Sequence, residues 1–116
     1  MAGQMIELSL RPYPGRLFVA KTKRDYQKAH QKLFAKRGKI PEGIFGRCTF
    51  QCRKGAWQYL VWAETLPNMA HELAHVVFHV FGNCGIDPRS GDEEPFCYLL
   101  AQLISDAQFK VNDYGD

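Results

Sequence analysis

The chain has 116 residues, of which 46% are hydrophobic and 23% are charged, and its formal net charge is +3. This composition is close to that of globular proteins, so it excludes a disordered or fibrous chain, and the length predicts a single domain over residues 1–116. No apolar run approaches the length of a membrane span and the N-terminus lacks the pattern of a secretory signal, so we expect a cytoplasmic protein.

The charges are distributed unevenly along the sequence. Residues 1–63 contain 13 Lys and Arg but three acidic residues, whereas residues 64–116 contain two basic and nine acidic residues. Within the basic half, Lys28, Lys32 and Lys36 are expected to form an exposed stripe on a helix. Such a stripe is typical of a solvated helix face, and the alternative is an electrostatic surface for nucleic acid or an acidic protein partner.

The first elements along the chain are predicted to be a strand and a helix. Residues 15–22 (GRLFVAKT) begin at a Pro-Gly turn and contain β-prone residues, which predicts a strand. Apolar residues then recur at helical spacing over residues 23–37, and Gly38 is expected to end this helix. Residues 38–46 are rich in Gly and Pro and predict a loop.

The second half of the chain predicts a hairpin and two helices. Residues 47–63 divide into two β-prone halves around Lys54-Gly55, which indicates a β-hairpin. A helix is expected over residues 69–81, then a loop over residues 82–93 and an amphipathic helix from residue 94 to about residue 110. The sequence therefore predicts an α+β fold, a small three-stranded sheet packed with about three helices.

The segment MAHELAHVVFHVFG places ionisable side chains within the apolar helix expected over residues 69–81. His71 and His75 are one turn apart on the same helix face, so both imidazoles can bind one ion. Glu72 is offset around the helix, where its carboxylate can take a proton from an attacking water. The H-E-x-x-H pattern therefore predicts a Zn²⁺ site that hydrolyses a peptide bond, and the alternative is a chance pattern whose histidines make local hydrogen bonds.

HELAH, together with EEPFCYLL at residues 93–100, resembles the zincin metallopeptidases. The narrower resemblance is to the small H-E-x-x-H proteins of bacteriophages and prophages, of the gluzincin type, and it covers about residues 57–105. It implies a zincin-like minimal α+β fold with a small sheet packed on the metal-binding helix. It also implies a peptidase activity and a Glu followed four residues later by Tyr, here Glu94 and Tyr98.

The third protein ligand to the zinc is expected to be a carboxylate, with Asp92, Glu93 and Glu94 as candidates. We prefer Glu94, because Pro95 favours a helix start that fixes residue 94 and because the resemblance aligns Glu94 with the family's acid. Tyr98 could donate its hydroxyl to a developing oxyanion as a catalytic residue, or it could be a buried residue that holds the helices together.

Other possible ligands are less well spaced. His79 lies about 12 Å along the helix axis from His71, too far to share an ion, so we expect His79 to be a core residue or to support the ligands. The C-x3-C spacing is poor for zinc, so ordinary buried thiols are expected at all four cysteines, Cys48, Cys52, Cys84 and Cys97.

These features predict a zinc-dependent metallopeptidase, encoded by a phage, that acts on a peptide or protein substrate. His71, His75 and an acid would bind the metal, and Glu72 would be the general base. The alternative is a metal-containing binding protein that engages a host protein or nucleic acid through its basic N-terminal half without catalysis. A structural use of the motif without metal is the third reading, and no membrane association is expected.

Overall fold

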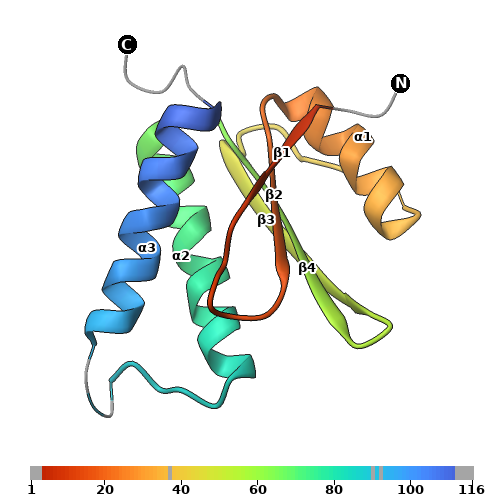
Figure 1. The fold of residues 1–116 in the computed structure, drawn as a ribbon. Helices are drawn as coiled ribbons and strands as arrows, with labels where there is room; N and C mark the ends of the chain where they lie inside the picture. The colour runs from red at the N-terminus through yellow and green to blue at the C-terminus, as the bar shows by residue number, and fades with distance from the viewer. Residues whose placement is uncertain (1–3, 37, 90, 92, 112–116) are drawn as a thin grey trace.

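The computed structural model describes residues 4–36, 38–89, 91 and 93–111. One mixed sheet is enclosed by α1 on one face and by α2 and α3 on the other (Figure 1). None of the described helices is long and apolar enough to cross a membrane. In chain order the elements are β1 (Met5–Leu8), β2 (Arg16–Ala20), α1 (Lys23–Phe34), β3 (Gly46–Arg53), β4 (Ala56–Ala63), α2 (Leu66–Asn83), α3 (Glu94–Asp106) and a π-helical turn (Ala107–Val111).

The strand order in the sheet is β1-β2-β4-β3. β1 and β2 are antiparallel, β2 and β4 are parallel, and β3 and β4 are antiparallel. A parallel pair needs a long crossover connection, and α1 together with β3 supplies it between β2 and β4. This topology puts β3 at an edge of the sheet.

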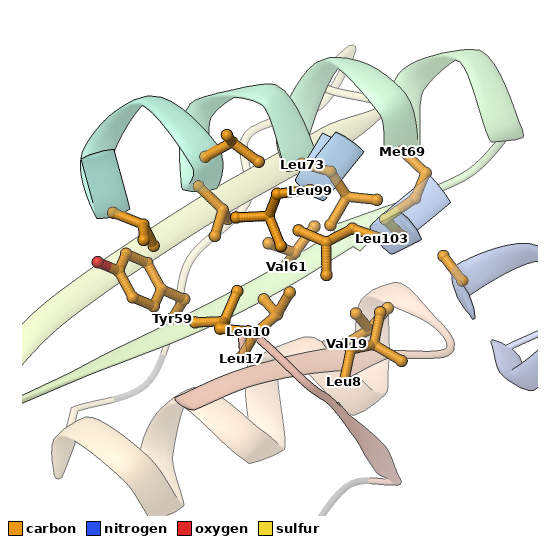
Figure 2. Packing of buried hydrophobic residues seen from close by; sticks show 14 of the residues in the cluster. Leu8, Leu10, Leu17, Val19, Tyr59, Val61, Met69, Leu73, Leu99 and Leu103 are labelled. Atoms are coloured by element: carbon orange, nitrogen blue, oxygen red, sulfur yellow. The ribbon is translucent and has the colours of Figure 1, made fainter. Parts of the chain in front are cut away.

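The core depends on β4, whose side chains are buried on both faces of the sheet. Leu60 and Trp62 pack with α1, while Tyr59, Val61 and Ala63 pack with α2 and α3. All five are at most 3% exposed. Figure 2 shows how the second group lies among side chains of β1, β2, α2 and α3, including Leu8, Leu17, Met69, Leu73, Leu99 and Leu103.

The helix that carries the H-E-x-x-H motif is longer than the sequence predicts. α2 begins at Leu66 rather than residue 69, because the Thr65 hydroxyl caps it by accepting a hydrogen bond from the Asn68 amide at 3.3 Å. Pro67 fits the first turn, where its missing N–H has no helical partner. The buried stripe of α2 faces the sheet and α3, and consists of Met69, Leu73, Val76, Val77, Val80 and Phe81.

The broad α+β fold and three helices are confirmed, but the expected three-stranded sheet is wrong, because the sheet has four strands. The missed strand, β1, has four residues and is held by its pairing with β2. The first helix also ends earlier than expected, at Phe34, because Ala35 adopts the left-handed conformation with φ of 56°. The hairpin turn at Lys54-Gly55 is confirmed, with positive φ at both residues.

Candidate metal centre

The two motif histidines converge on the open side of α2. Both side chains are exposed, and their Nε2 atoms are 3.2 Å apart. The rings are nearly perpendicular, with centroids 4.8 Å apart. Since α2 buries its apolar stripe against the sheet and α3, His71 and His75 are left on a face that a metal ion can reach.

The separation of the two nitrogens fits a shared zinc ion. Two Zn–N bonds of about 2.0–2.1 Å at a tetrahedral angle place the nitrogens roughly 3.3–3.4 Å apart. The observed 3.2 Å between His71 and His75 is close to this value. The same 3.2 Å separation also allows one neutral imidazole to donate a hydrogen bond to the other. The distance between the two nitrogens is therefore compatible with chelation of one ion, and equally with a hydrogen bond between the rings.

Glu72 lies beside the pair, against the edge strand β3. A Cβ added at Gly46 would be 3.0 Å from Glu72 Oε2 and 3.1 Å from its Cγ. A larger residue at this position would therefore push the Glu72 side chain from where it lies. Gly46 was not recognised from the sequence, because its contact with Glu72 exists only after β3 and α2 pack together.

An open cleft of about 580 Å³ runs between α2 and β3. His75 and Glu72 line it together with a mainly apolar surface that includes Ile44, Phe50 and Phe78. These three side chains are 38%, 44% and 57% exposed. The motif histidine and carboxylate therefore face an apolar channel.

Cys48 also lines this cleft, on the same face of β3 as Gly46. Burial, together with the negative charge of Glu72, raises the pKa of the Cys48 thiol to about 12. The thiol is therefore neutral at physiological pH, which makes it a poor metal ligand and a poor nucleophile. Cys48 and Cys52 are four residues apart on a strand, roughly 13 Å, so they do not share an ion. The expected burial of the thiols is wrong, because Cys52, Cys84 and Cys97 are exposed and Cys48 is half-buried.

His79 is held in an aromatic cluster away from the histidine pair. Its ring centroid is 3.9 Å from that of Phe50 and 4.5 Å from that of Trp57. His79 Nδ1 lies 2.8 Å from the Tyr59 hydroxyl and 3.2 Å from the Asn83 amide nitrogen. Because the Asn83 amide can only donate, His79 Nδ1 is an acceptor. His79 is half-buried and lines the same cleft as His75, so the expectation that it is a core residue is wrong, and its support of the ligands stays a prediction.

The described residues bring no third ligand to the pair. In residues 4–36, 38–89, 91 and 93–111, no group of three or more His, Cys, Asp or Glu could hold a metal ion. Glu94 begins α3. Two residues later, the ring centroid of Phe96 lies 4.7 Å from that of Phe78 and 5.6 Å from that of Phe81, both on α2. α3 thus starts beside the C-terminal half of α2, beyond His75. Glu94 as a ligand stays a prediction.

The other candidates lie elsewhere. Tyr98 is 71% exposed on α3 and does not line the cleft, so the reading that it is buried between helices is wrong. Its role as a hydrogen-bond donor in catalysis stays a prediction. Glu93 is exposed at the N-terminal cap of α3, and Asp92 lies outside the described residues.

No known protein family, curated protein or solved structure matches the chain.

Acid should destabilise the fold through His79. Burial lowers the pKa of His79, so below about pH 6.5 the unfolded chain binds a proton that the folded chain does not. Stability from neutral His79 is present above that pH and is lost as the pH falls through the folded pKa. In urea denaturation with EDTA, we expect the free energy of unfolding to drop between pH 7.5 and pH 5, and to drop less in His79→Gln. Equal drops in both proteins would assign the effect to other groups.

Proposed function

We propose that this chain is a zinc-dependent peptidase in which His71 and His75 hold the metal and Glu72 is the general base. The observation that carries the proposal is the 3.2 Å separation of the two Nε2 atoms on one exposed helix face. The carboxylate of Glu72 against Gly46, at the edge of an open cleft, supports it. A histidine pair with a neighbouring carboxylate is the arrangement that hydrolytic zinc sites use.

The residues of the chain would move one proton in the reaction. Bound zinc would supply a Lewis acid that polarises the scissile carbonyl. Glu72 takes a proton from water as the water oxygen bonds to the carbonyl carbon, and later gives that proton to the amide nitrogen as the C–N bond breaks. The products are a carboxylic acid and an amine, and Glu72 returns to its starting state.

The lining of the cleft favours an unfolded or extended polypeptide with apolar side chains. Ile44, Phe50 and Phe78 expose apolar surface inside it, and burying such surface on binding is favourable. β3 is an edge strand, so its outer backbone groups can pair with an extended peptide. The proposed substrate is therefore a polypeptide segment bound beside β3.

Zinc content tests the metal site. Tag-free protein reconstituted with zinc and dialysed should hold about one equivalent by elemental analysis, and His71→Ala/His75→Ala should hold less than about a tenth. His30→Ala is the matched control, because His30 is on α1, across the sheet. Less than about a tenth of an equivalent in the unaltered protein would end the proposal.

The third ligand is tested by zinc titration of two neighbouring variants. We expect Glu94→Ala to weaken zinc affinity by on the order of 10 to 100-fold or more, while Glu93→Ala has little effect. The opposite ranking would assign the ligand to Glu93. Unchanged affinity in both variants would exclude Glu93 and Glu94 as the third ligand.

Catalysis is tested at Glu72. Glu72→Gln should keep its zinc and its thermal midpoint but lose roughly 10²–10⁴-fold in turnover, because the amide cannot accept the proton from water. The substrate would be a set of unfolded polypeptides, with cleavage products identified by mass spectrometry. Glu64→Gln makes the same chemical change outside the cleft and should leave turnover intact. Full turnover in Glu72→Gln would exclude Glu72 as the general base.

A further inference from the structure

A second concave site lies on the other face of the sheet, between α1 and β3. It is a groove of about 720 Å³ lined by residues of α1, of β3 and of the segment that joins them. The lining includes His30, Phe34, Lys36, Lys39, Arg47 and Gln51. Arg47 also lines the cleft beside α2, but the groove contains none of the motif residues of α2, so its ligand can be tested separately from the proposed peptidase activity.

The groove is positively charged. Lys36, Lys39 and Arg47 line it, and none of the acidic residues that the structure describes does. All three side chains are exposed, and no described acid forms an ion pair with any of them. Three cations from two separate chain segments therefore converge on one hollow without protein counter-charges, which attracts an anionic ligand.

Local contacts hold the walls of this groove in place. His30 Nδ1 hydrogen-bonds to the carbonyl oxygen of Lys36, and the Tyr26 hydroxyl hydrogen-bonds to Thr49 Oγ1. A Cβ added at Gly38 would be 2.9 Å from atoms of both His30 and Tyr26. Glycine at position 38 thus lets the chain lie close against α1 at this point, next to Lys39. The cations are presented by a built surface rather than by a free loop.

Aromatic side chains lie beside the cations. His30 and Phe34 are partly exposed, and their rings meet edge to face with centroids 4.8 Å apart. Gln51 and Thr49 add neutral hydrogen-bonding groups to the floor. An acidic peptide would use the cations alone, whereas a nucleic acid uses phosphate-binding cations together with aromatic rings on which bases stack.

We propose that the groove between α1 and β3 binds single-stranded nucleic acid. Lys36, Lys39 and Arg47 contact backbone phosphates, and a base stacks on the exposed surface of His30 and Phe34. Because stacking on aromatic rings does not depend on base identity, binding has little sequence preference.

The direct test is fluorescence anisotropy of labelled 12-nucleotide oligo-dT and oligo-U with the full chain. Three neutralised phosphates give a slope of log K against log salt of about −2, so affinity should fall roughly 20-fold between 50 and 200 mM salt. No binding at 50 mM salt would overturn the proposal. Equal competition by a poly-glutamate peptide would assign the groove to an acidic protein partner instead.

Charge-reversal variants distinguish binding in the groove from attraction by the overall positive charge of the protein. Lys36→Glu/Lys39→Glu should weaken binding at least about tenfold, since both side chains line the groove. Lys28→Glu/Lys32→Glu makes the same change in net charge on exposed residues of α1 that do not line the groove, and should change affinity by less than about threefold. Equal losses in the two variants would show that only the overall field attracts the oligonucleotide.

The stacking component is tested by Phe34→Ala. Affinity should fall at least about fivefold while the salt slope is unchanged, because the variant removes an aromatic surface and no charge. Circular dichroism and thermal melting would establish that each variant is folded. Unchanged affinity in folded Phe34→Ala would contradict the assignment to nucleic acid.

Discussion

The packing of α2 against β4 is the constraint on which the rest of the structure depends. Only Glu64 and Thr65 separate the two elements, so α2 must cross the sheet directly from the end of β4. The apolar stripe of α2 then sets its rotation, with Leu73 fully buried over Val61 (Figure 2). Since His71 and His75 lie outside this stripe, the contacts that form the core also aim both imidazoles at the surface beside β3.

β3 serves both faces of the sheet because its side chains alternate. Cys48 and Phe50 face α2 and line the apolar cleft, whereas Thr49 and Gln51 face α1 and line the basic groove. The register of β3 on β4 fixes this division, and a slip by one residue would exchange the two sets. Placing a strand at the edge of the sheet thus lets one segment contribute to two chemically different sites.

Sequence patterns predicted the structural features that depend only on residues close together in the sequence. Helical spacing was sufficient to place His71 and His75 together, and Lys54-Gly55 was sufficient to place the hairpin turn. β1 was missed because its four residues are too few to show a clear alternation, and they become a strand only by pairing with β2. The contact of Gly46 with Glu72 was missed for a related reason, since the edge position of β3 follows from the order of strands, which no local pattern encodes.

The position of α3 links metal affinity to packing. Two imidazoles alone leave other coordination positions of a zinc ion to be filled by water or further ligands. For Glu94 to fill one, the start of α3 would have to move along α2 toward His75, which would disturb the contacts of Phe96 with Phe78 and Phe81. The free energy of zinc binding would then offset the loss of this aromatic packing, so metal binding and the docking of α3 would be thermodynamically coupled. If α3 instead stays in place, the affinity of the site is limited to what two histidines provide.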